Sequence, residues 1–391
     1  MVQTLERSSG RRFPADLPDA LRDAIEAHRD EAERLRRLPD GLTGVLRAAG
    51  AFALTTPIER GGAELSLTAL VDLYEAFGRI DGPVAWTIWN GNMGFAAAML
   101  DPAAADRIWT GERDPVVANS ARVTGTASAV DGGYRLSGRW DIVSAVDAAD
   151  WAALFGIVLE GDGPRFDAHG APDVRVFFVP RADMEVIDTW HTSGMRGTGS
   201  NSVVVEGALV AEDLAISPFA PALVDRPLYR IPAFTIASCG AAPIVVGIAQ
   251  AALDEVVALA PSKATDGGQV LAQRGHAHTW LGTAQTSLDA ARALLRQAAS
   301  TIDAMAVAGE AVDELPRARL RAAMSHAAQV ARDVLSRGQQ LASSTAVYTD
   351  NRIERLVRDG NVAAQHMILS ATHIDILGRL MLGQPAGTPI V

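Results

Sequence analysis

The sequence predicts a mostly helical protein with a central β domain, because the period of its apolar residues changes twice along the chain. The first and last parts carry apolar residues at helical spacing. The middle part consists of short alternating runs separated by turns. We therefore expect an N-terminal helical domain over residues 1–115, an antiparallel β domain over residues 116–218, and a C-terminal four-helix bundle domain over residues 219–391.

The N-terminal part contains a succession of helix signals. The run LPDALRDAIEAHRDEAERLRRL has helical spacing, with Pro18 near its start. The run SLTALVDLYEAFGRI begins with Ser66, a favourable N-cap, and has Gly78 near its end. PVAWTIWNGNMGFAAAML and DPAAADRIW follow, and Asp101 before Pro102 is typical of a helix start. This part is therefore expected to be helical up to about Pro115.

The middle part predicts a compact β domain. The stretch VVANSARVTGTASAVDGGYRLSGRWDIVSAVDAADWAALFGIVL holds alternating runs broken by Gly-Gly and Ser-Gly turns, and DVRVFFVP, MEVIDTW and NSVVVEGALV continue the pattern. Short strands separated by turns are typical of a mostly antiparallel sheet. EGDGPRFDAHGAPD is polar and without apolar periodicity, so we expect a hairpin connection at the surface.

The C-terminal part predicts four long amphipathic helices that pack as a bundle. Their sequences are IVVGIAQAALDEVVALA, HTWLGTAQTSLDAARALLRQAASTIDAMAVA, ELPRARLRAAMSHAAQVARDVLSRGQQLASS and RIERLVRDGNVAAQHMILSATHIDILGRLMLG. Alanine-rich faces permit close packing of such helices, and the aromatic content of 5% agrees with a core of Ala, Leu and Val.

Composition excludes several classes of function. The formal net charge of −11 gives no support to binding of nucleic acid or of an anionic membrane. Cys239 is the only cysteine, which excludes intramolecular disulfides and multi-cysteine metal sites. His276 and His278 would point to different faces of a helix, so we expect no metal site. With a polar start and no apolar run of ~20 residues, a soluble cytoplasmic protein is expected.

Four stretches, in this order along the chain, resemble the acyl-CoA dehydrogenase superfamily. GGYRLSGRWDIVSAVDAADW resembles the strand that runs over the flavin, and WHTSGMRGTGSNSVVVEGALV resembles the later strand pair of the β domain. VVGIAQAALDEV resembles the first bundle helix, and RIERLVRDGNVAAQH resembles the last. The likeness spans nearly all of the chain and implies the acyl-CoA dehydrogenase-like fold.

Within that superfamily, the closer resemblance is to the two-component flavin-dependent monooxygenases, such as the oxygenase components of 4-hydroxyphenylacetate and phenol hydroxylases. It is carried by SGRW, by GMRGTGS and by the ending RD…QH…GR…LG, which is Arg358–Asp359, Gln365–His366, Gly378–Arg379 and Leu382–Gly383. It implies reduced flavin (FADH2 or FMNH2) that reacts with O2 to a C4a-hydroperoxyflavin. The small-molecule substrate would be an aromatic that is hydroxylated or an amine that is N-oxygenated, in secondary metabolism or catabolism.

The resemblance also implies a homotetramer and a separate NAD(P)H-dependent flavin reductase. No GxGxxG fingerprint follows a strand and opens a helix, so the sequence shows no nicotinamide-binding domain of its own. This observation favours a partner reductase.

Two residues are expected to be catalytic. The helix ERLVRDGNVAAQHM aligns with the one after which a large group of dehydrogenases carries its Tyr-Glu base, and that pair falls on His366–Met367. An imidazole there suits a hydroxylase, because histidine titrates near neutral pH and can take a phenolic proton. Ser144 stands where the resemblance places a hydroxyl facing flavin N5. The alternatives are a buried structural histidine for His366 and a strand serine for Ser144.

The stretch GMRGTGSNSV has small and hydroxyl-bearing residues that let backbone N–H groups approach a ligand, although a plain turn or bulge uses them too. By resemblance, Ile142 and Trp140 form an apolar wall beside the flavin ring. The residues that we expect to bind the cofactor are Ser120, Gly125, Thr126, Trp140, Ile142, Ser144, Arg196, Gly197, Thr198, Gly199, Ser200, Lys263, Gln273 and Arg274. The last three are placed at the flavin phosphate across a subunit interface.

Polar and aromatic residues in an apolar helix suggest a substrate cavity, although the tryptophans could equally fill the N-terminal core. The residues that we expect to bind substrate are Trp86, Trp89, Asn90, Asn92, His366 and Met367. Arg355, Arg358 and Asp359 are interpreted as an ion-pair network that fixes the last helix.

Two other functions stay open from the sequence. One is an acyl-CoA dehydrogenase-type FAD enzyme that oxidises an acyl thioester, which needs a carboxylate base. Met367 cannot be that base, although some dehydrogenases carry the glutamate on another helix. The other is a non-catalytic scaffold of the same fold.

Overall fold

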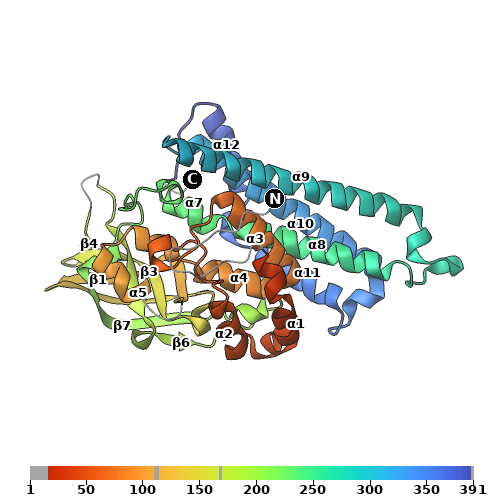
Figure 1. Ribbon diagram of the computed structural model, residues 1–391, viewed down its shortest axis with the longest axis horizontal. Helices are drawn as coiled ribbons and strands as arrows, with labels where there is room; N and C mark the ends of the chain where they lie inside the picture. Colours follow the sequence, from red (N-terminus) through yellow and green to blue (C-terminus); the bar gives the residue numbers. More distant parts are fainter. Residues whose placement is uncertain (1–15, 110–113, 167–169, 389–391) are drawn as a thin grey trace. The chain divides into compact units, whose positions relative to one another are not determined.

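The computed structural model describes residues 16–109, 114–166 and 170–388. It divides into two compact units. Unit 1 consists of Met1–Leu65, Trp86–His191 and Arg196–Ala237, and unit 2 of Ser66–Ala85, Thr192–Met195 and Ser238–Val391. The fold is the predicted one, mostly helical with one sheet whose strands come from the middle of the chain (Figure 1). The division into three domains at residues 115/116 and 218/219 remains a prediction from the sequence.

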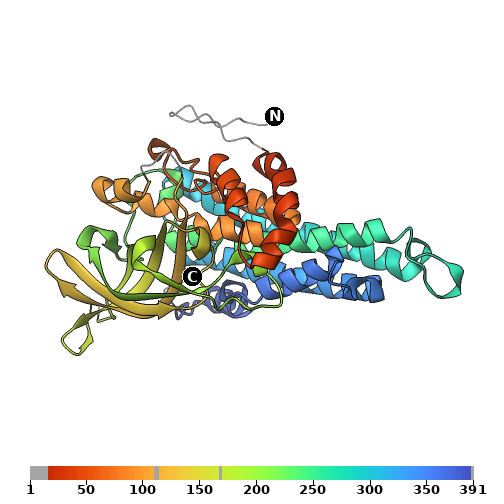
Figure 2. The same cartoon turned by 90° about the horizontal axis from the view of Figure 1, so that it is seen from below.

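Unit 1 combines short helices with the sheet. Its helices are α1 (Leu17–Leu35), α2 (Asp40–Ala48), most of α4 (Gly82–Gly91), α5 (Pro102–Trp109), α6 (Pro227–Arg230) and α7 (Ala233–Ser238). Its strands are β1 (Val117–Val130), β2 (Gly133–Trp140), β3 (Trp151–Glu160), β4 (Gly163–Pro164), β5 (Val174–Pro180), β6 (Glu185–Ile187), β7 (Ser202–Ala211) and β8 (Ala215–Ile216). The strands form one twisted sheet in the order β6-β7-β2-β1-β3-β5-β8, with β4 beside β3 (Figure 2).

The sheet is mostly antiparallel, as predicted, but the pairing of β1 with β3 is parallel and makes the sheet mixed. β1 pairs with β2 antiparallel, but it pairs with β3 parallel. The cause is the connection over residues 141–150, which carries the chain from one side of β1 to the other before β3 begins. β3 and β5 form the expected antiparallel pair around the polar 160–173 stretch, of which residues 167–169 lie outside the described part.

Trp140, the last residue of β2, packs against glycines of β1 and β2. It is fully buried, and its indole N–H donates to the carbonyl of Phe155 at 2.8 Å. A Cβ on Gly125 would lie 2.2 Å from the Trp140 ring, and one on Gly138 would lie 2.9 Å from it. Both glycines therefore make room for the indole, and the register of β1 and of β2 shifts beside them.

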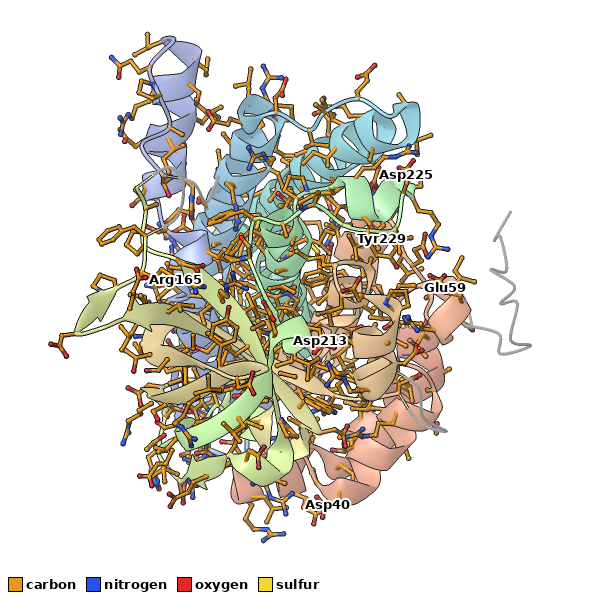
Figure 3. The ribbon with its side chains drawn as sticks, turned by 90° about the vertical axis from the view of Figure 1, so that its left-hand side faces the viewer. Asp40, Glu59, Arg165, Asp213, Asp225 and Tyr229 are labelled. Carbon is orange, nitrogen blue, oxygen red and sulfur yellow. The ribbon has the colours of Figure 1, made fainter. Side chains whose placement is uncertain are left out.

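The segment between the sheet and the bundle helices is held by polar contacts within unit 1. Arg226 pairs with Glu59 and Glu64, and the Tyr229 hydroxyl donates to the carbonyl of Thr55 at 3.2 Å. Figure 3 labels Glu59, Tyr229 and the neighbouring Asp225. These bonds fix the 225–230 region onto the N-terminal part of the chain.

Unit 2 is built from helices that run side by side (Figures 1 and 2). They are α3 (Leu67–Ile80), α8 (Ala241–Leu259), α9 (Gly275–Ala308), α10 (Glu314–Ala342), α11 (Arg352–Ala363) and α12 (Thr372–Met381). The Ser66 side chain caps α3 as predicted, by accepting from the backbone N–H of Ala69 at 3.3 Å. α3 and α8 touch at glycines, because a Cβ on Gly78 would lie 2.5 Å from the Ile244 carbonyl oxygen.

The last predicted helix is broken into pieces. α11 ends at Ala363, a 3-10 turn covers Met367–Leu369, and α12 begins at Thr372. The His366 side chain caps the 3-10 turn by accepting from the backbone N–H of Ile368 at 3.3 Å. A side-chain cap of this kind stabilises a new start rather than a continuous helix.

One helical stretch, Ala233–Leu259, is long and apolar enough to cross a membrane. However, 94% of its most apolar window is buried inside the protein, so it serves as a core helix. Gln250, Asp254 and Glu255 interrupt this stretch, so it is not an uninterrupted apolar run of ~20 residues and agrees with the expectation that the chain has none.

Candidate active site

A strained loop follows Trp140 in unit 1. Ile142 and Ala145 have positive φ angles of 62° and 67°, which non-glycine residues adopt at a cost of roughly 1–3 kcal/mol each. The backbone N–H of Val143 donates to the Asn201 carbonyl at 2.9 Å, and that of Ala145 donates to the Thr198 carbonyl at 3.3 Å. The loop is thus tied to residues 198–201 by alternate N–H groups.

The intervening positions are arranged differently. Within the described part of the chain, the backbone N–H groups of Ile142 and Ser144 have no hydrogen-bond acceptor. The Ile142 side chain is 49% exposed although it is apolar, whereas Ser144 is buried. Unused N–H groups beside an exposed apolar side chain suit a flat ligand that has both polar edges and an apolar face.

Four buried polar groups form a chain of hydrogen bonds in this unit. The Trp86 indole N–H donates to Ser144 Oγ at 3.2 Å, Ser144 Oγ lies 2.8 Å from Ser200 Oγ, and Ser200 Oγ lies 2.7 Å from Thr198 Oγ1. Each of the four residues is at most 7% exposed. Three of the residues predicted to bind the cofactor are therefore brought together, and Trp86 joins them.

The fold explains why some residues of the stretch GMRGTGS are what they are. Gly199 has φ of +53°, and a Cβ there would lie 2.3 Å from Asp147 Oδ2. Arg196 pairs with Glu33 at 3.4 Å, so its charge is engaged inside the protein. Thr198 and Ser200 are the members of the stretch that join the buried hydrogen-bond chain, and Gly197 is buried beside them.

The other residues of the sheet that were predicted to bind the cofactor differ in how deeply they are buried. Ser120 is buried near the end of the first part of β1, and Thr126 is exposed beyond the register shift. Gly125 owes its small size to Trp140, as described above, and Trp140 itself presents no exposed surface. Both are therefore core residues in this structure.

Helix α4 carries the predicted substrate residues of unit 1. Trp86 and Trp89 pack edge to face with ring centroids 4.7 Å apart, and the Trp89 N–H donates to the Ala237 carbonyl at 2.8 Å. Asn92 is buried, and its amide bonds the backbone of Ala51, Leu54 and Ile88. The Asn90 side chain donates to the Trp86 carbonyl at 3.0 Å. Asn92 thus has a structural use for its polar side chain.

His366 and Met367 belong to unit 2. His366 is half-buried and caps the turn after α11, whereas Met367 is 76% exposed. In the same unit, Arg358 bonds Glu354 at 2.6 Å and donates to the Ser193 carbonyl, while Asp359 accepts from the Met195 N–H at 2.5 Å. Arg358 and Asp359 thus anchor the 192–195 segment and α11, as their interpretation as a structural network predicted.

The three residues predicted at the flavin phosphate lie in the connection between α8 and α9. Lys263 donates to Thr345 Oγ1 at 2.7 Å, and Arg274 donates to Thr265 Oγ1 at 2.8 Å. Gln273 is exposed, and its side-chain oxygen accepts from the Val270 N–H at 3.4 Å. Each of these two bonds joins a basic side chain to a threonine hydroxyl.

Sequence reasoning missed a group of buried polar residues in unit 2. Arg321 is 3% exposed, and burial lowers the pKa of its guanidinium to about 10, so it stays charged at neutral pH. Burial, with the charge of Arg321 as a further cause, lowers the pKa of His373 below its ordinary value. Burial also raises the pKa of the Cys239 thiol to about 12. The signal in the sequence is an arginine on the alanine-rich face of RARLRAAMSHAA.

Comparisons with known proteins agree with this fold. The family model of the acyl-CoA dehydrogenase N-terminal domain matches residues 11–106, and that of the C-terminal domain matches residues 239–371. The solved structure of XiaF from Streptomyces sp. in complex with FADH2 and glycerol has a TM-score of 0.86 and 27% identity, over 96% of this chain and 98% of that one. The fold is that of the acyl-CoA dehydrogenase superfamily.

Two curated relatives specify the branch. The chain is 30% identical over 365 residues to the flavin-dependent monooxygenase oxygenase subunit HsaA of Rhodococcus jostii, which covers 89% of this chain and 92% of that protein. It is 29% identical over 379 residues to indole-3-acetate monooxygenase of Pseudomonas putida, which covers 96% and 95%. The chain belongs to the flavin-dependent monooxygenases of the acyl-CoA dehydrogenase superfamily.

Proposed function

We propose that this chain is the oxygenase component of a two-component monooxygenase that uses reduced flavin and O2 to hydroxylate an aromatic or N-oxygenate an amine. The observation that carries this proposal is the similarity, over nearly the full length of both chains, to proteins named as flavin-dependent monooxygenases. A separate NAD(P)H-dependent reductase supplies the reduced flavin. We propose in addition that the protein is soluble and cytoplasmic.

The loop of residues 141–146 fits a flavin. When bound, the reduced flavin activates O2 for insertion of one oxygen atom into the substrate. With a flavin bound here, the Ser144 hydroxyl would hydrogen-bond the ring at N5, the backbone N–H groups of Ile142 and Ser144 would serve its polar edge, and the Ile142 side chain would cover its apolar face. Ser120 and Thr126 serve the pyrimidine end of the ring.

His366 is the proposed acid or base of the reaction, and Met367 lies beside it at the substrate. In unit 1, the rings of Trp86 and Trp89 and the Asn90 side chain are proposed to contact the substrate. Asn92 instead stabilises the fold around them through its backbone hydrogen bonds. Exclusion of water by the bound flavin and substrate would limit loss of hydrogen peroxide.

Lys263, Gln273 and Arg274 are proposed to bind a flavin phosphate of a neighbouring subunit in a homotetramer. Unit 2 exposes large apolar side chains that such an assembly would cover, among them Met381 and Leu382 at 71% and 78% exposure. Light scattering on the purified protein measures the subunit number directly.

A stopped-flow experiment tests the function. The protein is mixed without oxygen with reduced FMN or FAD, then with O2, while absorbance, hydrogen peroxide and products from a panel of phenols, amines and indole-3-acetate are recorded. An absorbance transient distinct from both reduced and oxidised flavin, followed by an oxygenated product, is expected. Immediate formation of free oxidised flavin contradicts the proposal. FAD retained through purification and reduced by acyl thioesters would indicate a dehydrogenase, and no affinity for any flavin would indicate a scaffold.

A further inference from the structure

The buried chain Trp86–Ser144–Ser200–Thr198 restricts how the Ser144 hydroxyl can bond. An indole N–H is a donor only, so Trp86 occupies one of the two acceptor positions of Ser144 Oγ. The 2.8 Å bond to Ser200 occupies a second position, which is either the other acceptor or the proton of Ser144. A serine hydroxyl has three hydrogen-bonding positions in total, so one is left for a ligand.

Whether this remaining position of Ser144 donates or accepts depends on the direction of the hydrogen bonds between Ser144, Ser200 and Thr198. If Thr198 donates to Ser200 and Ser200 donates to Ser144, both acceptor positions of Ser144 are filled and its proton points to the ligand. If the bonds run the other way, Ser144 donates to Ser200 and accepts from the ligand. Flavin N5 is an acceptor in the oxidised ring and carries a proton in the reduced ring, so reversal of the hydroxyls serves both states.

We propose that Trp86 and Ser200 are positioning residues that hold the Ser144 hydroxyl toward the flavin with a single bonding position free. This inference rests on the proposed function, since it concerns the same flavin site. The geometry supports it independently of the ligand, because all four groups are buried and each distance lies within hydrogen-bonding range. Trp86 then acts through its N–H in addition to any contact of its ring with substrate.

The first test uses the protein without flavin. In protein labelled with 15N-tryptophan, the indole N–H resonance of Trp86 is identified by its loss in Trp86→Phe. Ser144→Ala removes the acceptor and should shift that resonance upfield. The resonance of Trp109, a buried tryptophan of the same unit whose ring packs on Phe178 with centroids 6.0 Å apart, should stay in place. An unchanged Trp86 resonance would overturn the inferred bond.

The second test measures hydrogen peroxide release from the protein loaded with reduced flavin and exposed to O2 without substrate. Loss of one hydrogen bond should speed release roughly fivefold to tenfold in Ser144→Ala, Trp86→Phe and Ser200→Ala. Because Trp86 acts through Ser144, Trp86→Phe should add nothing to Ser144→Ala in the double variant. Trp109→Phe is the matched control for removal of a buried indole and should release peroxide at the wild-type rate.

The outcomes separate the inference from the function on which it rests. Wild-type protein that releases peroxide as fast as free reduced flavin would overturn both. Slow release in the wild type, with Trp86→Phe and Ser144→Ala effects that multiply in the double variant, would overturn only the positioning role. Equal effects of Trp86→Phe and Trp109→Phe would do the same, because they would reflect a general loosening of the unit.

Discussion

At the scale of single residues, the structure assigns internal reasons to some predicted site residues and leaves others available for a ligand. Gly125 is small because the Trp140 ring lies against it, and Gly199 is small because of its positive φ and the Asp147 carboxylate. The Ser144 hydroxyl, by contrast, bonds Trp86 and Ser200 and keeps one hydrogen-bonding position, and its backbone N–H has no acceptor in the described part of the chain. The hydroxyl-bearing residues of the loop, rather than its glycines, therefore carry the proposed chemistry.

His366 combines a structural and a proposed chemical role, and two substitutions separate them. Its ring caps the turn at Met367–Leu369, so His366→Ala should lower the free energy of unfolding by about 0.5–1 kcal/mol. His366→Asn replaces the capping Nδ1 with an amide oxygen that can accept the same bond and should cost less, yet both variants lose the imidazole. We expect both to form roughly tenfold less product per O2 consumed, because general acid–base groups contribute that much or more. Flavin titration, product yield and urea unfolding measure the three quantities. Full product yield in His366→Asn would show that His366 is not the acid or base of the reaction.

At the scale of helices and strands, the sequence predicts those elements whose pattern arises from burial of one face. The spacing of apolar residues predicted α1, α3, α9 and α10, because each packs one face into a core. α8 was also predicted as an amphipathic helix, but it is buried on all sides over Ala241–Leu253. Strand direction was not predictable, since alternation is the same whichever way a strand runs, and the parallel β1–β3 pair depends on the path of residues 141–150. The break after α11 was also missed, because its cause is a side-chain cap from His366 rather than a proline or glycine.

The candidate site likewise contains some features that the sequence predicted and others that it did not. Resemblance placed Ser144, Thr198 and Ser200 among the cofactor residues, and the structure joins them by hydrogen bonds. The N–H bond of Trp86 to Ser144 was not predictable, because 58 residues separate the two along the chain and no periodicity relates them. Contacts of this kind depend on the packing of α4 against the loop after β2.

The start of α3 gives a prediction about how one helix anchors another. The Asp303 carboxylate on α9 accepts from the backbone N–H groups of Leu67 and Thr68, each at 2.9 Å, and from Thr68 Oγ1 at 2.6 Å. Asp303→Ala leaves these donors without their acceptor and should lower the free energy of unfolding by about 2–3 kcal/mol. Asp303→Asn keeps one acceptor and should cost about half of that. Ser66→Ala, which removes the local cap alone, should cost about 1 kcal/mol or less. Urea unfolding of the three variants measures the order, and an Asp303→Ala variant as stable as the wild type contradicts it.

At the scale of the whole molecule, stability at alkaline pH is linked to a single thiol. Cys239 is fully enclosed in unit 2, and burial, with the charge of Asp303, raises its pKa from 9.0 to about 12. Tyr74 and Arg321 also interact with it electrostatically. Because the folded state disfavours the thiolate, this contribution to stability is complete below pH 9, the unfolded value, and is lost as the pH rises toward 12.

Replacement of the thiol isolates this contribution from the other groups that titrate in the same range. The wild type should lose about 1 kcal/mol of unfolding free energy between pH 8 and pH 10 through Cys239, and Cys239→Ala should lack that loss. The measurement is the difference between the urea unfolding free energies of the two proteins at pH 8, 9 and 10, in which the contributions of Tyr74 and Arg321 largely cancel. Cys239→Ala creates a small cavity and lowers stability by a constant amount, so only the slope with pH is diagnostic. Parallel curves for the two proteins would show that the thiolate is tolerated in the folded state, and that the core around Cys239 admits water.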